Sequence, residues 1–228
     1  MTCNLTTAIV GMGIKHNLEA IVIAIFPVQK GPPSRRHVFL ADSDGVTGIT
    51  VWNQDVNKFP KEVLGGVVKI TRASVSIYQG KKSLVLNKES LVEVDTITRS
   101  PLAVWWESVA LQTPLPLPAG IIASDNAIIN VYGVLALITH ESKEVNGQER
   151  RVTTIHMCAQ TARLQLRGWD LEPSTVEAIT LLRDRVTQVR RIRMTSFGDN
   201  KIGEILDSAT GTQFLPFTDA ALTQFWAE

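Results

Sequence analysis

Cysteine and net charge are both scarce in this chain of 228 residues. There are two cysteines, Cys3 and Cys158, and no CxxC pair. This excludes a disulfide scaffold, argues against a cysteine-rich zinc site, and is typical of a reducing intracellular compartment. With 23 basic against 22 acidic side chains the formal net charge is +1. A protein of this kind cannot hold nucleic acid by bulk positive charge, so any such role would need local charge and aromatic surfaces.

Other absences narrow the function further. The four histidines are scattered without an HExxH or HxH pattern, so we interpret them as surface or strand residues and not as metal ligands. No apolar run reaches the roughly 18–20 residues of a membrane helix, and the start lacks the features of a secretory signal. There is no Walker loop, GxSxG motif or Cys–His arrangement, and Asp42 and Asp44 belong to a turn sequence. We expect a non-enzymatic protein with no cofactor, no metal and no membrane partner.

Short strand-like runs dominate the first half of the chain, whose composition (44% hydrophobic overall) is rich enough to bury a core. A hairpin turn is predicted at 42–45, where the sequence is DSDG. The periodicity predicts strands over 19–29, 37–41, 46–53, 67–78 and 83–94, with a short helix over 55–63. A helix between strands three and four is typical of the five-stranded OB barrel.

The same order recurs in the second half, after a charged segment at 140–151 predicted to be a hairpin loop. Ser174 and Glu177 have the spacing of a capping box at the start of the predicted helix. The strands are predicted over 129–139, 152–159, 163–169, 188–197 and 202–207, with the helix over 173–182. We therefore predict an all-β fold with short helices, made of two tandem five-stranded OB-fold barrels.

The predicted domains are OB-fold 1 at residues 1–98, a proline-containing linker at 99–120, and OB-fold 2 with a C-terminal helix at 121–228. Trp105 and Trp106 in the linker are expected to pack on a barrel, because adjacent exposed tryptophans are a liability. The tail over 218–228 has the pattern of a short amphipathic helix. It either covers the open end of the second barrel or binds a protein partner through Leu222, Phe225 and Trp226.

Two stretches of the first half, GVTGITVWNQDVNKF (45–59) and VVKITRASVSIYQGKKSLVL (67–86), resemble the DNA-binding OB-folds of the replication protein A large subunit. The resemblance covers residues 15–97 and implies that Trp52 and Tyr78 are two base-stacking aromatics. Tandem barrels are also similar to meiosis-specific relatives of that subunit and to telomere-end-protection proteins. A nuclear location is implied by this resemblance alone.

The second half resembles the family more weakly. IRMTSFGDNKIGEI (192–205) places Phe197 at the second stacking position. LQLRGWD (164–170) departs from the family pattern, because Arg167 stands at the first stacking position and Trp169 follows two residues later. An arginine can still stack on a base through its guanidinium plane.

A sequence-tolerant binder of single strands needs flat π surfaces and a few cations along a groove. We expect Trp52 to stack from strand three and Tyr78 from the tip of the strand-four hairpin, with Lys81 and Lys82 near phosphates. Each has a plainer alternative, since Trp52 could be a core residue and the lysines a solvated turn. Phe39 and Phe59 are expected in the core.

Arginines complete the predicted site. Arg35 and Arg36 are expected in the loop between strands one and two, on the opposite side of the usual groove. Arg191 and Arg193 are expected to share one face of strand four by alternation, with an ion-paired exterior face as the alternative. The full set of candidate nucleic-acid-binding residues is Trp52, Tyr78, Lys81, Lys82, Arg35, Arg36, Arg72, Arg167, Trp169, Arg191, Arg193 and Phe197.

These features predict a tandem OB-fold protein that binds single-stranded DNA in replication, recombination, repair or telomere maintenance. The alternatives are a protein–protein interaction subunit of a larger DNA-maintenance complex and an RNA-binding OB protein. Residues 1–98 carry 11 basic and 8 acidic side chains, whereas residues 99–228 carry 12 and 14. We therefore expect stacking to dominate the affinity, with a shallow salt slope of roughly −0.7 per phosphate contacted.

Overall fold

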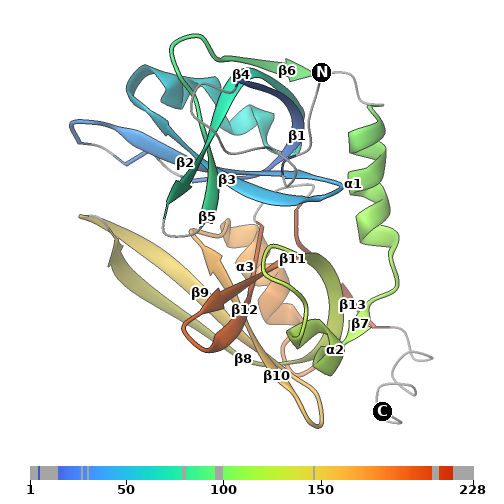
Figure 1. The fold of residues 1–228 in the computed structure, drawn as a ribbon. Helices are drawn as coiled ribbons and strands as arrows, with labels where there is room; N and C mark the ends of the chain where they lie inside the picture. The colour runs from blue at the N-terminus through green and yellow to red at the C-terminus, as the bar shows by residue number, and fades with distance from the viewer. Residues whose placement is uncertain are drawn as a thin grey trace. The chain divides into compact units, whose positions relative to one another are not determined.

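The computed structural model describes residues 5, 15–26, 28–29, 31–78, 81–95, 100–145, 147–206 and 211–217; the side chains at 61, 76–78, 81–82 and 95 lie outside this description. The chain divides into two compact units, residues 1–108 with 208–210 and residues 109–207 with 211–228 (Figure 1). Each unit holds one barrel. Within the described residues, every helix is too short or too polar to cross a membrane.

The first barrel is a closed ring of five strands. These are β1 (His16–Ile25), β2 (Arg35–Asp42), β3 (Gly45–Trp52), β4 (Val67–Tyr78) and β5 (Lys81–Val85). They pair in the order β1-β2-β3-β5-β4, and β4 pairs again with β1 to close the ring. β3 and β5 run parallel and the other neighbours antiparallel. This is the predicted OB-fold.

Two short 3-10 helices, η1 (Asn53–Lys58) and η2 (Lys61–Val63), replace the predicted helix between strands three and four. Their segment inserts Phe59, which is fully buried, into the core of the barrel. The predicted fifth strand is split into β5 and β6 (Leu91–Asp95), which follow one another along the same edge of β4. The split lies opposite a bulge in β4 at Arg72, whose φ is 56°.

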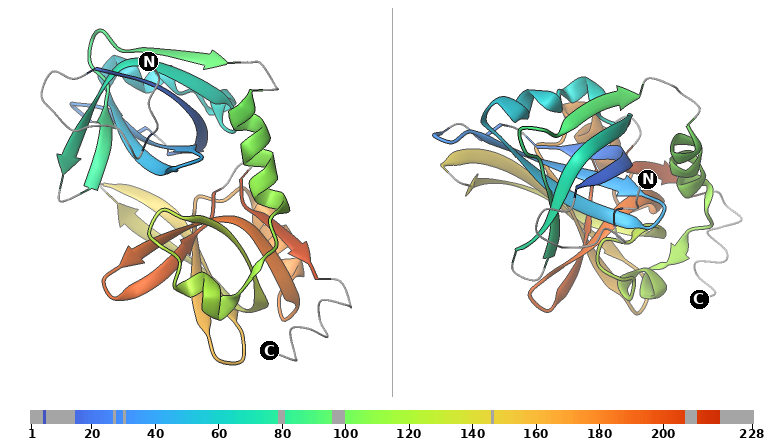
Figure 2. Two further views of the ribbon diagram at one scale, coloured as in Figure 1. Left: turned by 45° about the vertical axis from the view of Figure 1, so that its right-hand side comes forward. Right: turned by 45° about the horizontal axis from the view of Figure 1, so that its top comes forward.

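The second barrel repeats this topology (Figure 2). Its strands are β8 (Ile128–Val145), β9 (Gln148–Cys158), β10 (Arg163–Trp169), β11 (Val186–Phe197) and β12 (Asn200–Glu204). They pair in the order β8-β9-β10-β12-β11, with β11 returning to β8 and with β10 parallel to β12. A short strand, β13 (Gln213–Pro216), extends the edge of β11. The prediction of two tandem OB barrels is confirmed.

Two local predictions for this half are wrong. The segment 140–151 is not a loop, because β8 and β9 stay paired as far as Val145 and Gln148. A two-stranded antiparallel ribbon satisfies its backbone groups without a buried face, so its charged side chains do not prevent pairing. The helix α3 (Pro173–Leu181) begins at Pro173, which suits the first turn, and it has no side-chain cap from the predicted box.

The predicted linker folds into α1 (Pro101–Leu111), β7 (Leu115–Pro116) and α2 (Leu117–Ile121). Its prolines are compatible with helix because Pro101 and Pro118 stand in first turns, where no N–H partner is required. The amide of Ala103 donates to Ser100 Oγ at 3.1 Å, which caps α1. Trp106 is buried, in agreement with the expectation that it is packed and not exposed to solvent. The predicted tail helix at 218–228 lies outside the described residues.

Candidate nucleic-acid interface

The outer face of the β2–β3 pair carries a cluster of rings. Val38 and Leu40 are fully buried in the core, so by alternation His37 and Phe39 lie on the opposite face of β2. Phe26, which follows β1, joins them: its ring centroid lies 6.0 Å from that of His37 and 5.9 Å from that of Phe39. The His37 and Phe39 centroids are 4.9 Å apart. The expectation that Phe39 belongs to the core is therefore wrong, and strand alternation was the signal that could have shown it.

A glycine makes room for this cluster. Gly48 of β3 is the cross-strand partner of Phe39. A Cβ at Gly48 would lie 3.0 Å from Cε1 of His37 and 3.3 Å from Cε1 of Phe39. His37 is also held across the strands, because its Nδ1 is 3.0 Å from Thr50 Oγ1. The rings can lie close to the strand because position 48 has no side chain.

Trp52 and Arg35 extend the ring cluster along the same pair of strands. Trp52 ends β3 and is 42% exposed, so it is not a core residue. Arg35 is its cross-strand partner, with the guanidinium Cζ 5.8 Å from the indole centroid and Nε donating to Gln29 Oε1 at 2.5 Å. Arg35 and Arg36 thus belong to β2 and not to the preceding loop, and Arg35 lies beside Trp52 instead of across the groove. Arg36 donates through Nη1 to the Phe59 carbonyl at 2.6 Å.

The other candidates of the first barrel lie on β4 and β5. Tyr78 is the last residue of β4 and pairs with Lys81, while Lys82 pairs with the preceding residue of β4. Their backbones form the expected hairpin, and their side chains lie outside the described part of the chain. Stacking by Tyr78 and phosphate contact by the lysines stay predictions.

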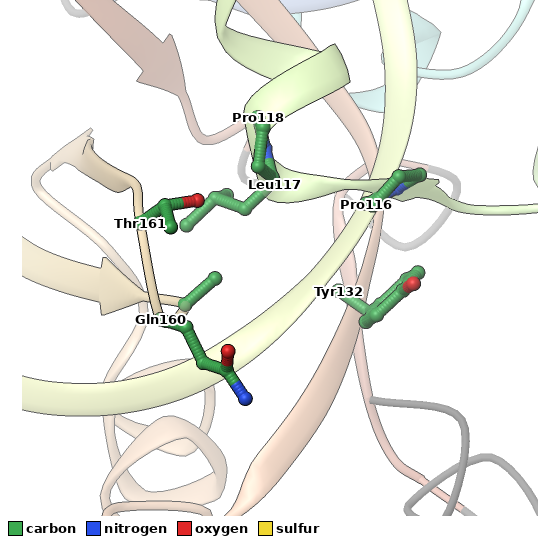
Figure 3. Close-up of a pocket in the computed structure, with 7 residues that line it drawn as sticks. Pro116, Leu117, Pro118, Tyr132, Gln160 and Thr161 are labelled. Atoms are coloured by element: carbon green, nitrogen blue, oxygen red, sulfur yellow. The ribbon is translucent and has the colours of Figure 1, made fainter. Parts of the chain in front are cut away.

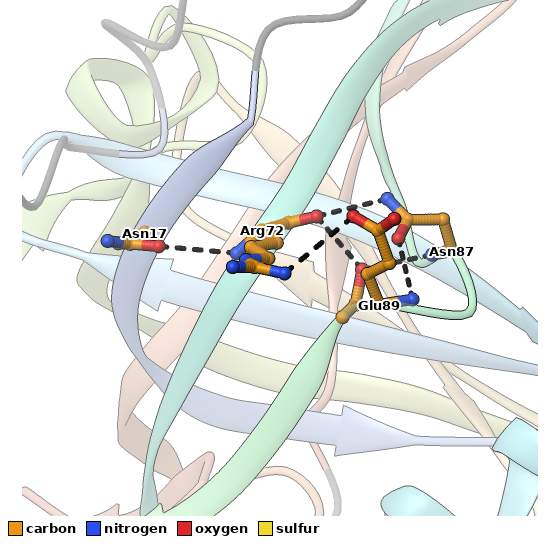
Figure 4. A network of polar contacts seen from close by, with 5 residues as sticks. Asn17, Arg72, Asn87 and Glu89 are labelled. Atoms are coloured by element: carbon orange, nitrogen blue, oxygen red, sulfur yellow. Dashed lines mark hydrogen bonds and ion pairs between the residues drawn. The ribbon is translucent and has the colours of Figure 1, made fainter.

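Arg72 occupies a structural junction (Figure 4). Its amide donates to Asn17 Oδ1 at 3.2 Å, and its carbonyl accepts from Asn87 Nδ2 and Ser90 Oγ, each at 3.0 Å. The exposed guanidinium lies 3.9 Å from a carboxylate oxygen of Glu89. The backbone of Arg72 therefore shapes the bulge of β4, and its side chain is on β4 and not on the outer face of β2 and β3.

In the second barrel the corresponding face is basic. Leu164 and Leu166 are buried in the core, so Arg163, Gln165 and Arg167 lie together on the opposite face of β10. Arg163 is exposed and the other two are half-buried. Two of these three residues are cations, whereas the equivalent stretch of β3 holds none.

Trp169, and not Arg167, occupies the position of Trp52. Each tryptophan ends the third strand and is followed by a left-handed residue, Asn53 with φ 51° or Asp170 with φ 47°. In both barrels the amide of that residue donates to a carbonyl of the neighbouring segment at 2.8 Å. The sequence resemblance had placed Arg167 at this position, two residues too early.

The rings of Trp169 and Phe197 in the second barrel each have an arginine guanidinium lying over them. The Arg150 guanidinium carbon lies 5.0 Å from the Trp169 centroid, and its Nε and Nη2 donate to Asp170 Oδ2 at 2.7 and 2.6 Å. The Arg167 guanidinium carbon lies 5.7 Å from the centroid of Phe197, which is 69% exposed. Arg150 was missed as a candidate, since only the fold brings it to Trp169.

Arg191 and Arg193 are turned away from solvent. They are 4% and 7% exposed, and the left-handed backbone at Arg191, with φ 57°, interrupts the alternation that was expected to bring both to one face. Arg193 forms an ion pair with Glu204 and donates through Nη1 to Asn126 Oδ1 at 3.0 Å. We leave both arginines out of the proposed interface.

The second barrel also contains an apolar pocket of about 230 Å³ (Figure 3). It is lined by uncharged side chains, among them Pro116, Leu117, Pro118, Tyr132, Gln160 and Thr161. None of these belongs to the predicted site. Among the described residues, no group of His, Cys, Asp or Glu is placed to hold a metal ion.

No family model and no curated protein matches this chain. Among solved structures, it is similar to a replication protein A heterotrimer bound to ssDNA, with 15% identity, a TM-score of 0.46, and coverage of 93% of this chain but 52% of the other. This chain thus spans about half the length of that one.

Fission yeast Pot1 with ssDNA is 11% identical over 94% of this chain and 87% of the other, with a TM-score of 0.47. A murine DNA binding protein bound with ds DNA is 12% identical over 89% and 97%, with a TM-score of 0.37. Similarity at these identities and TM-scores does not assign a ligand, so the ligand must be inferred from this chain's own residues.

Proposed function

We propose that this chain is a non-enzymatic protein that binds single-stranded DNA across the outer face of its first barrel. The observation that carries the proposal is the row of Phe26, His37, Phe39 and Trp52, with Arg35 beside it, on the β2–β3 face. OB-folds bind oligonucleotides on the face of strands two and three. Each unpaired base that stacks on a ring contributes about 1–3 kcal/mol.

The composition of this face favours single strands over duplex. In a duplex the bases are already stacked on one another, so their faces are not available to a protein ring. A duplex binder relies instead on many phosphate contacts, whereas Arg35 is the one cation in the described ring row. A ring surface with little charge therefore suits a strand whose bases are unpaired.

Arg35 and Trp52 are arranged to extend a stack. Gln29 holds the guanidinium beside the indole, and Trp52 still exposes 42% of its surface. A base on the exposed side would lengthen the pile of flat groups by one, with a cation–π contribution from the arginine. The preference for DNA over RNA rests on the resemblance to replication protein A. So do a nuclear location and a role in replication, recombination, repair or telomere maintenance.

The test is a titration of the full chain with labelled oligo-dT of about 16 nucleotides, followed by fluorescence anisotropy. Trp52→Leu should weaken binding by about tenfold to a hundredfold, because one stacking platform is lost. Phe39→Leu should weaken it similarly. Leu91→Ala, which truncates an exposed apolar side chain on β6, is the control and should leave the affinity unchanged.

Two outcomes would overturn the proposal. The first is wild-type affinity in a Trp52→Leu/Phe39→Leu variant whose circular dichroism shows a folded barrel. The second is the absence of binding to oligo-dT at low salt, which would favour a protein-partner module. Titrations with oligo-U and with duplex DNA of equal length decide between DNA, RNA and duplex as the ligand.

A further inference from the structure

We propose that the second barrel binds the sugar–phosphate backbone of the strand instead of its bases, and that Trp169 and Phe197 serve as platforms that hold arginines. The inference rests on the proposed function, since it assigns the second barrel a part in binding the same strand. It follows from three observations: how the rings are covered, which arginine lacks a carboxylate, and which cations share its face.

The rings stand at the positions of the first-barrel stackers but are covered differently. Phe197, like Tyr78, ends the fourth strand and pairs with the first residue of the fifth. Arg150 lies on Trp169 with its side chain only 12% exposed, and two hydrogen bonds fix it to Asp170. A base would have to displace a paired guanidinium from that ring face. Arg35, over Trp52, donates instead to a neutral amide, that of Gln29, and forms no ion pair with a carboxylate among the described residues.

Arg167 lies against the exposed ring of Phe197. Among the described residues its buried Nε has no hydrogen-bond partner. The acidic residue nearest in the ladder is Glu204, the parallel partner of Arg167, and Arg193 already forms an ion pair with it. The buried ion pair of Arg193 therefore neutralises the carboxylate of Glu204, which could otherwise pair with Arg167.

The cations form a row of donors. Arg163, Gln165 and Arg167 lie on one face of β10, and same-face neighbours on a strand are about 6.6 Å apart. All three side chains offer N–H donors, which suit phosphate oxygens. The first barrel has Gly48 and Thr50 at the ladder positions of Gln165 and Arg167. Phosphodiester oxygens are the ligand that this row fits.

Two labelled strands of equal length separate the modes: oligo-dT and an abasic deoxyribose-phosphate strand, which has phosphates but no bases. The wild-type chain should bind both at low salt, the abasic strand more weakly. Arg163→Gln/Arg167→Gln should abolish measurable binding to the abasic strand. It should also make the log–log salt slope for oligo-dT shallower by about 0.7 for each arginine that contacts a phosphate.

Two control variants sharpen the result. Trp52→Leu should weaken oligo-dT binding while leaving the salt slope and the abasic affinity unchanged, since stacking carries no counterion release. Arg183→Gln removes an exposed arginine that lies next to Asp184 after α3, and should change nothing. Phe197→Leu should lower the abasic affinity, because the platform under Arg167 is lost.

The inference is overturned if the double arginine variant keeps both its abasic affinity and its salt slope, or if the wild-type chain does not bind the abasic strand. It is also overturned if Phe197→Leu weakens oligo-dT binding alone, because the ring would then stack on a base. Failure of the proposed function is distinguishable: there Trp52→Leu has no effect on oligo-dT, whatever the arginine variants do.

Discussion

In the first barrel, strand two carries His37 and Phe39 on its outer face, and strand three faces them with a glycine and a threonine. In the second barrel the same ladder positions hold Thr154 and His156 on strand two, with Gln165 and Arg167 on strand three. Strand three thus carries small side chains in the first barrel and long polar ones in the second. One backbone can present rings for bases or donors for phosphates, because outward positions of a barrel do not affect its closure.

The closure itself is built alike in both barrels. Arg72 and Arg191 are both left-handed, with φ of 56° and 57°, and each interrupts the fourth strand where it leaves the first. Each amide donates to an asparagine of the barrel's first strand, Asn17 or Asn130. Each carbonyl accepts from the hydroxyl of the residue just before β6 or β13, Ser90 or Thr212. Such bulges increase the local bend that a closed barrel needs. The two barrels therefore share the bulge and differ in their outer faces.

Substitutions in the two cores should destabilise the protein most, and they test whether the cores are separate. Phe59 and Met157 are fully buried, each in the core of one barrel. Phe59→Ala should cost about 3–5 kcal/mol and Met157→Ala about 2–5 kcal/mol of unfolding free energy, through lost burial and a residual cavity. Hydrogen exchange should show each substitution raising exchange mainly in its own barrel. Equal deprotection of both barrels by either variant would contradict separate cores.

The second prediction concerns the asparagines at the two bulges, which differ in burial. Asn130 is 3% exposed and also donates to the carbonyls of Val109 and Gln112, whereas Asn17 is exposed. Asn130→Ala should cost about 2–4 kcal/mol, because it leaves buried groups without partners, and Asn17→Ala about 0.5–1.5 kcal/mol.

Urea unfolding of each variant measures the two costs. Asn17→Asp keeps an oxygen at the Oδ1 position to accept from the Arg72 amide, so it is the matched control and should stay within about 0.5 kcal/mol of the wild type. Equal losses at Asn17 and Asn130 would show that burial does not separate the two bulges.

The smallest effect concerns the room that a glycine leaves. Gly48→Ala would bring a Cβ to about 3 Å from the imidazole of His37 and displace the ring cluster. We expect oligo-dT binding to weaken by about threefold to tenfold with the fold intact. Gln165→Ala is the control at the equivalent position of the second barrel. The contribution of base stacking is measured as the difference between the oligo-dT and abasic affinities, and it should stay unchanged in this variant. If Gly48→Ala bound oligo-dT with unaltered affinity, the ring cluster would not be part of the binding site.

Much of the fold could be predicted because strand alternation is a local property. The order of strands follows from it, whereas the turn at 42–45 follows from its DSDG sequence and the stacking position of Trp52 was implied by the family resemblance. The hairpin at 140–151 and the helices at 101–121 could not be predicted in the same way. Composition indicates a loop or a linker there, whereas pairing and helix capping are what form the structure.

The site was less predictable than the fold. Trp52 and Arg35 were both named from the sequence, but their contact depends on the pairing of β2 with β3. Arg150 meets Trp169 and Asp170 across β9 and β10 in the same way. A sequence shows which residues can stack or carry charge, but not which of them become neighbours.

Local sequence patterns and composition are enough to predict two barrels, a lack of catalytic motifs and a near-zero net charge, which limits bulk attraction to nucleic acid. Only the folded barrel shows which arginines are buried in an ion pair, as Arg193 is with Glu204, and which are exposed to solvent, as Arg163 is. The physical reason is that alternation depends on neighbours along the chain, whereas an ion pair or a ring stack depends on which strands the closed barrel brings together.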